Sequence, residues 1–348
     1  MSQDSDLQPQ FKPDFKRALA CVSACPIYTP TPIVEIEDQG VTVSVKDESP
    51  RLALGSFKAL GGVYAVAQLI LEEAAAKLGH RPAIETLLSD DVRSVAKAMT
   101  FVCASAGNHG LAVAAGSKLF GANARVYLSE EVPKSFAKRL QDHDATVCVS
   151  GATYEESLLA ANQDADDTGA YLLADGSWPG YTYRPSLVME GYTVIASELC
   201  SKYETTDRWP SDVYLQAGVG GMAAALAFMI RKNWRVQPRI VIVEPSAADC
   251  LAISAAQNKM IEATGPVSNM GRLDCKAASL LAFETLRDCD VHYLAISDDD
   301  ALQAVACMSD YGLHTTPSGA AGFAAWQIER SLAHTSGDRP LVIMSEQA

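Results

Sequence analysis

The sequence has no run of lysine or arginine and little positive charge overall. Its 348 residues include 42 acidic and 28 basic ones, which gives a formal net charge of −14. Because proteins bind nucleic acid through cations that neutralise phosphates, this balance argues against a nucleic-acid partner. The polar first six residues lack the basic and apolar segments of a signal peptide, so we expect none. The most apolar stretch, residues 217–230, contains three glycines and predicts a strand, a loop and a core helix instead of a membrane span.

The cysteines lack the spacing of a disulfide-rich or zinc-binding domain. Nine cysteines are an odd and scattered set, unlike the paired framework of small secreted proteins. Cys21 and Cys25 are close in sequence but lack the second pair of ligands that a zinc site requires. We therefore expect reduced, mostly buried thiols in a cytoplasmic protein.

The sequence does contain a regular alternation of strand-like and helix-like segments. Hydrophobic residues make up 48% and charged residues 20%, which indicates a globular protein long enough for about two domains. Segments 100–104, 124–128 and 212–216 have the composition of strands, and each is followed closely by a helical pattern. This order predicts an α/β protein with parallel sheets, in which ligands bind at the carboxyl ends of strands.

Lys58 is the first residue that indicates chemistry. It follows Phe57 and precedes mostly small residues, 59–62, and then an apolar helical stretch, residues 63–70. An apolar neighbour and the positive end of a helix dipole would lower the pKa of its amine. A lysine that is neutral can form an imine with an aldehyde. The alternative is an ordinary surface lysine at a helix start.

Three motifs further along the chain lie at predicted helix starts. Glycines in residues 218–222 let backbone N–H groups approach a phosphate. Residues 105–110 offer a serine hydroxyl and the Asn108 amide, which suit a carboxylate and a ring oxygen. Residues 315–322 contain Ser318, whose hydroxyl can face a ring nitrogen. Tight strand–helix packing in the first motif, and a serine N-cap in the other two, are the alternatives.

Lys58 and these motifs, in this order, resemble the fold type II (tryptophan-synthase-β-like) pyridoxal-phosphate enzymes, from about residue 27 to the end of the chain. Within that group the chain looks most like the diaminopropionate ammonia-lyases, and it shares features with serine/threonine dehydratases. The closer likeness rests on residues 59–65, 107–110, 175–181, 189–192 and 243–245.

The resemblance implies a large cofactor-binding domain, residues 1–94 and 206–348, and a small mobile domain, residues 95–205, that closes over the substrate. It also implies a homodimer and pyridoxal 5′-phosphate as the cofactor. Lys58 would hold this cofactor as an imine and then act as the base at Cα.

The resemblance assigns further roles to polar residues of the motifs. Asn108 would contact the ring hydroxyl, Ser318 would face the ring nitrogen, and Ser105 would clamp the substrate carboxylate. The phosphate would be cradled by Gly218, Val219, Gly220, Gly221 and Met222.

Some positions depart from the pattern of these relatives. Ala106 stands where the ammonia-lyases carry an aspartate and the racemases a serine as a second base, so we expect action on L-substrates. Ala106 also matches the dehydratases, whereas Asp175 matches an acidic position of the ammonia-lyases suited to an amino leaving group. Asp175 is alternatively a solvated loop residue. Glu244 lacks the acidic residue six positions on that the dehydratase metal site uses, so we expect no obligatory metal.

These features predict α,β-elimination from a β-amino- or β-hydroxy-substituted L-amino acid, which gives a 2-oxo acid and ammonia. Two alternatives stay open: a β-replacement synthase of the cysteine-synthase kind, and a catalytically silent protein that binds another phosphorylated ligand. The charges of Arg272, Asp274 and Lys276 are interpreted as surface charge instead of substrate ligands. The expected partner is a small amino acid, without nucleic acid or membrane.

Overall fold

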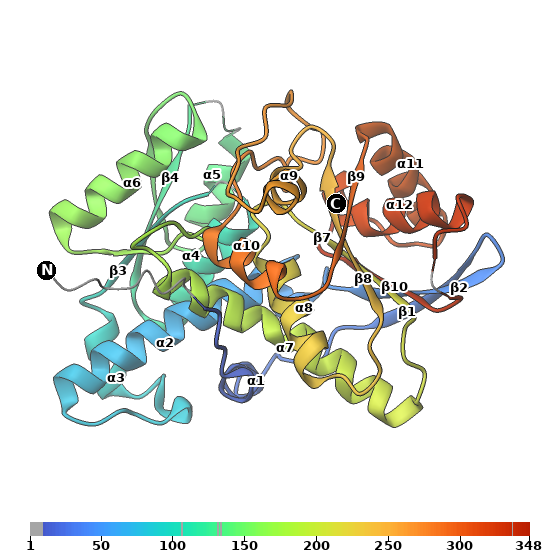
Figure 1. The fold of residues 1–348 in the computed structure, drawn as a ribbon. Coiled ribbons are helices and arrows are strands. Elements are labelled where there is room, and N and C mark those ends of the chain that lie inside the picture. Colours follow the sequence, from blue (N-terminus) through green and yellow to red (C-terminus); the bar gives the residue numbers. More distant parts are fainter. Residues whose placement is uncertain (1–9, 106, 131, 133, 336) are drawn as a thin grey trace, which may run out of the picture.

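Two separate sheets, each with helices packed against it, form the core of the described chain (Figure 1). The computed structural model describes residues 10–105, 107–130, 132, 134–335 and 337–348. Most neighbouring strands in both sheets are parallel, so the predicted α/β class is confirmed.

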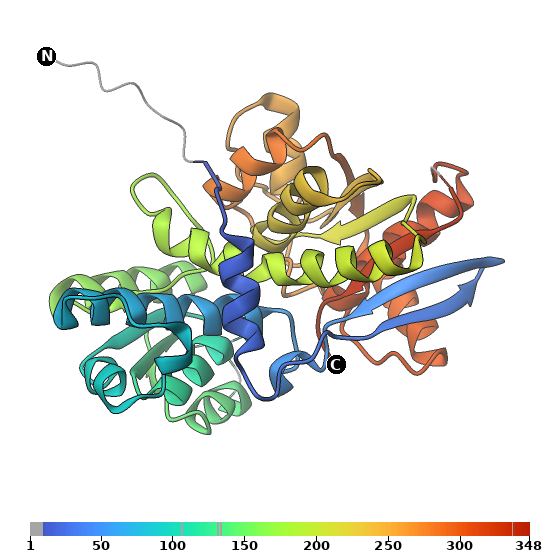
Figure 2. The same ribbon diagram turned by 90° about the horizontal axis from the view of Figure 1, so that it is seen from below.

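The larger sheet has six strands, and its spatial order differs from the chain order. The order is β1 (Ile33–Asp38), β2 (Val41–Asp47), β10 (Pro340–Met344), β7 (Asp212–Gln216), β8 (Arg239–Pro245) and β9 (His292–Ile296). Strands β1 and β2 form an antiparallel hairpin that projects from the edge of the sheet (Figure 2). The other neighbours pair in parallel. Strand β10, although late in the sequence, lies between β2 and β7.

The smaller sheet has four parallel strands, all within the predicted small domain. Their order is β5 (Thr146–Val149), β4 (Asn123–Leu128), β3 (Thr100–Ala104) and β6 (Tyr171–Leu172). The domain boundaries at residues 94/95 and 205/206 stay a prediction.

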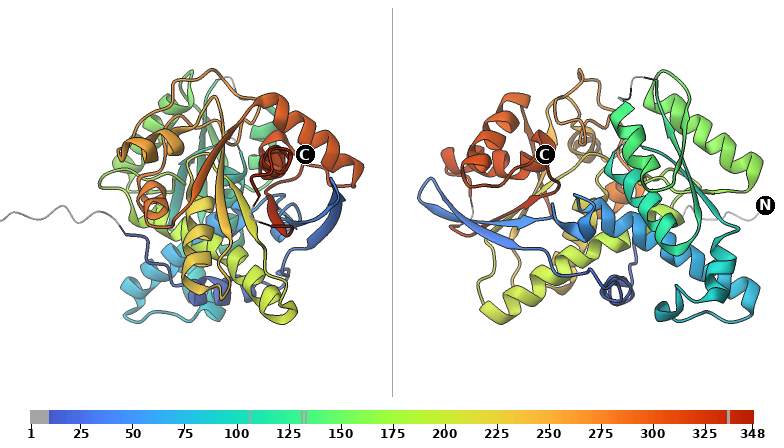
Figure 3. Two further views of the ribbon diagram at one scale, coloured as in Figure 1. Left: turned by 45° about the vertical axis from the view of Figure 1, so that its right-hand side comes forward. Right: turned by 180° about the vertical axis from the view of Figure 1, so that it is seen from behind.

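Twelve α-helices and two short 3₁₀ helices occur in the described residues. They are α1 (Phe15–Ser23), η1 (Arg51–Ala53), α2 (Lys58–Leu78), η2 (Ile84–Thr86), α3 (Asp90–Ala96), α4 (Asn108–Phe120), α5 (Lys134–Gln141), α6 (Tyr154–Thr168), α7 (Tyr183–Thr206), α8 (Gly221–Asn233), α9 (Cys250–Gln257), α10 (Leu280–Arg287), α11 (Asp298–Asp310) and α12 (Pro317–Ser331). Helices α2 and α7 run along one side of the molecule, below both sheets (Figure 3).

Alternate residues of the central strands face opposite layers of the core. Leu215 and Ile343 belong to the cluster that includes α8, whereas Tyr214 and Val342 belong to the cluster that includes α12. This alternation is the period of two that a strand imposes on its side chains. Because both faces are covered, the central strand β10 is buried and apolar throughout, as parallel strands usually are.

Helix α2 carries Lys58 and is packed between α4 and α7. Its glycines make this close packing possible, because a Cβ on Gly61 would lie 2.5 Å from the Tyr192 ring and one on Gly62 would lie 2.6 Å from Ala112 Cβ. Of the helices in the described residues, α2 is long and apolar enough to cross a membrane, but 72% of that stretch is buried inside the protein. It is thus a core helix.

The cysteines follow the expectation only in part. All nine are free thiols, as predicted. Only Cys103, Cys250 and Cys289 are buried, and the other six are half-buried, so the expectation of mostly buried thiols is wrong.

Candidate active site

Lys58 is the first residue of α2, and its side chain forms an ion pair with a distant carboxylate. The Lys58 Nζ donates a hydrogen bond to Asp175 Oδ2, which lies 117 residues further along the chain. The two side chains are only 21% and 19% exposed. Lys58 is therefore not a surface lysine, and Asp175 is not a solvated loop residue.

The ion pair controls the protonation of both groups. Burial tends to lower the pKa of Lys58, but the Asp175 carboxylate outweighs it and the pKa is raised above its usual value. Burial tends to raise the pKa of Asp175, but Lys58 holds it below its usual range. The prediction of a lowered lysine pKa is wrong for this structure, because the sequence gives no sign that a carboxylate touches the amine.

Two aromatic rings cover the lysine amine. The Lys58 Nζ lies 5.4 Å from the centre of the Phe57 ring and 6.0 Å from that of Tyr192. The Tyr192 hydroxyl is buried and has no hydrogen-bond partner among the described residues, and burial raises its pKa. A buried hydroxyl of this kind beside Lys58 is consistent with a site that takes a polar ligand.

The glycine loop lies beside this pair, between the end of β7 and the first turn of α8. A Cβ on Gly221 would lie 3.7 Å from the Tyr192 ring and 3.9 Å from the Asp175 carbonyl oxygen. Gly220 has a φ of 96°, and a Cβ there would lie 2.8 Å from Leu251. The loop is thus a backbone cradle that side chains would fill, and the N-terminus of α8 adds partial positive charge.

A second polar group forms around the carboxylate of Glu346, which the sequence motifs did not indicate. Glu346 follows β10 and accepts hydrogen bonds from Asn108 Nδ2 and, at 2.5 Å, from Thr316 Oγ1. Burial raises the pKa of Glu346, although Thr316, Arg272 and Asn108 partly offset it. Residue 346 also forms a β-bridge with Ser56, two residues before Lys58. An acidic residue two positions after an apolar strand was the available signal.

Arg272 and Ser318 connect this group to the glycine loop. The Ser318 hydroxyl oxygen accepts a hydrogen bond from the Arg272 backbone N–H at 3.0 Å. The Arg272 carbonyl oxygen would lie 3.1 Å from a Cβ on Gly218. The Arg272 guanidinium lies over the Phe136 ring and 3.7 Å from Glu346 Oε2. Arg272 is exposed at the surface, as interpreted from the sequence, but its side chain also reaches Glu346.

The loop before α4 brings the predicted carboxylate clamp to the same region. The Ser105 hydroxyl accepts a hydrogen bond from the Gly107 backbone N–H at 3.3 Å. A Cβ on Gly107 would lie 3.2 Å from the Arg272 guanidinium. The His109 imidazole points away, toward the Leu173 carbonyl oxygen, and burial lowers its pKa. Ala106 lies outside the described residues.

Glu244, the residue weighed for metal binding, has a structural partner. Its carboxylate accepts hydrogen bonds from the backbone N–H groups of Leu251 and Ala252, both at 2.8 Å, in the first turn of α9. No group of three His, Cys, Asp or Glu side chains placed to hold a metal occurs in the described part of the chain. The expectation that no metal is required stays a prediction.

The site residues fit a phosphorylated aldehyde cofactor. A half-buried lysine, a glycine cradle at a helix N-terminus and a serine hydroxyl converge from different elements. A Cβ at Gly218 or Gly220 would narrow the cradle. The individual roles predicted for these residues stay predictions.

Comparisons with known proteins agree with this chemistry. A family described as "Pyridoxal-phosphate dependent enzyme" matches residues 25–346. Diaminopropionate ammonia-lyase of Escherichia coli K12 is 32% identical over 282 residues, which cover 79% of this chain and 69% of that protein. L-threonine ammonia-lyase of Geobacter sulfurreducens is 25% identical over 76% of this chain and 62% of that protein.

Solved structures show the same likeness. The crystal structure of the E. coli diaminopropionate ammonia-lyase with D-serine has a TM-score of 0.81 and 27% identity, and it covers 97% of this chain and 91% of that one. The same enzyme with an aminoacrylate–PLP azomethine reaction intermediate gives a TM-score of 0.82 and 28% identity, over 96% of this chain and 88% of that one.

Proposed function

Because this chain belongs to the pyridoxal-phosphate dependent enzyme family, we propose that it is a lyase that eliminates the β-substituent of a small L-amino acid. The leaving group is an amino or a hydroxyl group, and the products are a 2-oxo acid and ammonia. The observation that carries this proposal is the half-buried Lys58–Asp175 pair beside the glycine loop.

The cofactor is pyridoxal phosphate, and four parts of the site would hold it. Lys58 would bind its aldehyde carbon, the glycine loop and the N-terminus of α8 its phosphate, and Asn108 its ring hydroxyl. The Ser318 oxygen already accepts from Arg272, so the Ser318 hydroxyl hydrogen is free to be donated to an unprotonated ring nitrogen. When bound, the cofactor supplies an electron sink for the electron pair at Cα.

The residues around it supply proton transfer and orientation. The Lys58 amine would remove the proton from Cα of the substrate. Asp175 is in contact with Lys58 and can hold a proton for the departing β-amino group. Ser105, the amides at the start of α4 and the Arg272 guanidinium would bind the substrate carboxylate.

The overall reaction balances for both leaving groups. Diaminopropionate and one water would give pyruvate and two ammonia molecules, and serine would give pyruvate and one ammonia. Ala106 offers no second base, so we expect the L-enantiomer to react.

The test is a substrate panel with the holoenzyme: serine, threonine, 3-hydroxyaspartate and diaminopropionate, each as separate enantiomers, scored for 2-oxo acid release. We expect release from an L-substrate without a second substrate, which a replacement synthase would need. The Lys58→Ala variant should lose both the visible absorption band of the bound cofactor and the activity. A band that persists in this variant would contradict the role of Lys58, and comparable rates on D-substrates would contradict the stereochemical choice.

Three finer points belong to the same proposal. We infer that the protein acts as a cytoplasmic homodimer and that its smaller domain closes over the substrate to exclude water. The free thiols and the resemblance support the first inference, and the separate smaller sheet supports the second. A monomer in sedimentation equilibrium would contradict the dimer.

A further inference from the structure

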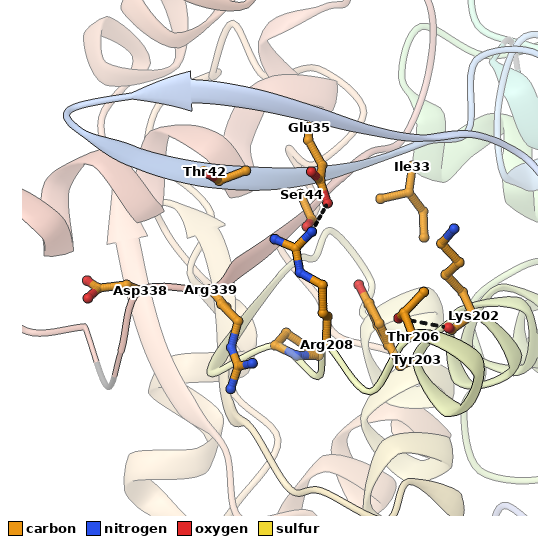
Figure 4. Close-up of a pocket in the computed structure, with 11 residues that line it drawn as sticks. Ile33, Glu35, Thr42, Ser44, Lys202, Tyr203, Thr206, Arg208, Asp338 and Arg339 are labelled. Atoms are coloured by element: carbon orange, nitrogen blue, oxygen red, sulfur yellow. Dashed lines mark hydrogen bonds and ion pairs between the residues drawn. The ribbon is translucent and has the colours of Figure 1, made fainter.

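A polar cavity lies away from the lysine site, between the β1–β2 hairpin, the C-terminal end of α7 and the chain just before β10 (Figure 4). Its volume is about 190 Å³. Three cationic side chains, Lys202, Arg208 and Arg339, line it. This concentration of positive charge contrasts with the net charge of −14 of the whole chain.

A buried hydroxyl group points into this cavity. Tyr203 is 5% exposed, and its Oη has no hydrogen-bond partner among the described residues. Its ring is fixed by Trp209 and Trp234, at centroid distances of 5.8 and 5.6 Å. The hydroxyl points toward the space below the hairpin (Figure 4). An unpaired buried hydroxyl is costly, so its position favours a ligand that pairs with it.

The charges around the cavity do not balance. Arg208 pairs with Glu35 at 3.5 Å, and Asp338 pairs with Arg330 at 3.2 Å. Both acidic residues of the lining are therefore already in ion pairs. Lys202 and Arg339 have no acidic partner among the described side chains, which leaves two unpaired cations at the cavity. An excess of two positive charges beside an unpaired hydroxyl donor matches a doubly charged oxyanion.

We propose that this cavity binds a small oxyanion with two negative charges, either a phosphate or a dicarboxylate. Lys202 and Arg339 supply the charge, and the Tyr203 hydroxyl donates a hydrogen bond. The ligand joins the hairpin to α7, two elements that are far apart in the sequence. The site is separate from the cofactor site and does not depend on the reaction assigned to that site.

The test uses the holoenzyme, in which the cofactor phosphate occupies the glycine loop. Inorganic phosphate and malonate are titrated at constant ionic strength set with chloride, by calorimetry and by the unfolding temperature. A bound ligand raises this temperature as its concentration increases. We expect at least one of the two anions to bind, and their relative affinities distinguish phosphate from dicarboxylate.

Substitutions separate this cavity from other anion sites. The Lys202→Ala/Arg339→Ala double variant should bind about tenfold more weakly or worse, because two charge-assisted contacts are lost. The matched control is Lys232→Ala, an exposed lysine in the last turn of α8, which should bind like the wild type. No binding to the wild type, or equal binding to the double variant, would overturn the proposal.

Tyr203→Phe provides an independent readout. The ring keeps its packing on Trp209 and Trp234, and only the hydroxyl is removed. We expect the anion affinity of this variant to be about three- to tenfold lower than that of the wild type. The unfolding temperature of the anion-free holoenzyme should be unchanged or higher, because an unpaired buried hydroxyl is removed. Wild-type anion affinity in this variant would refute the proposed contact.

Discussion

At the scale of single residues, the site depends on contacts that adjust protonation. Lys58 alone, buried beside Phe57 and Tyr192, would have a lowered pKa. Its contact with Asp175 reverses the direction, so the pair holds a positive and a negative charge in a half-enclosed space. Lys58 must therefore lose its proton before its amine can act as the base at Cα.

Asp175→Asn tests this pair. The amide keeps the size and a hydrogen bond to Lys58 but cannot hold a proton for a leaving amino group. We expect kcat with the preferred L-substrate to fall about 10²- to 10⁴-fold, with a smaller change in KM, because a general acid contributes to the transition state. Steady-state kinetics check this result, and the visible cofactor band should persist, in contrast to Lys58→Ala. An unchanged kcat would remove Asp175 from the mechanism.

At the scale of elements, the carboxyl ends of strands β7 and β8 have different roles. The segment after β7 forms the phosphate cradle, whereas the end of β8 places Glu244 at the first turn of α9. Burial raises the pKa of Glu244 to about 7, although the two backbone N–H groups partly offset this effect. The carboxylate that holds α9 therefore takes up a proton in the native state at mildly acidic pH.

This raised pKa predicts a pH-dependent stability. Between the unfolded pKa, about 4.3, and the folded value, the native state binds a proton that the unfolded state lacks. The stabilising contribution is full below the unfolded pKa and is lost as the pH rises through about 7. We expect the wild type to lose up to about 4 kcal/mol relative to Glu244→Gln across this window. Denaturant unfolding of both proteins at several pH values checks it, and parallel pH curves would contradict it.

At the scale of the whole molecule, a buried ion cluster connects the segment that leads to Lys58 with helix α7. Glu198 of α7 pairs with Lys46 of β2 at 2.6 Å and with Arg51 of η1 at 2.7 Å. Arg51 also pairs with Glu48 at 2.7 Å, and these side chains are at most 3% exposed. The cluster thus holds the larger sheet, the chain before Lys58 and the long helix below both sheets in one arrangement.

Glu198→Ala should destabilise the protein by about 3–5 kcal/mol, because two buried cations then share one carboxylate. The comparison is Lys138→Ala, which breaks an exposed ion pair with Asp142 and should cost at most about 1 kcal/mol. Denaturant unfolding measures both values. Similar small losses in the two variants would show that the buried cluster contributes little.

The sequence by itself determined the features that are local in the chain. The composition of each strand, the lysine at a helix start, the glycine loop and the serine at the start of α12 each depend on fewer than ten consecutive residues. Local propensity and backbone geometry decide such features, so they could be predicted together with the family resemblance.

Only the tertiary structure decided which of these side chains are in contact. Asp175 contacts Lys58 across 117 residues, and Glu346 contacts Asn108 across 238. The insertion of β10 between β2 and β7 brings Glu346 to the site, and no periodicity in the sequence encodes that order. Protonation and charge balance depend on such contacts, because electrostatic energies are set by distance and burial in the folded chain.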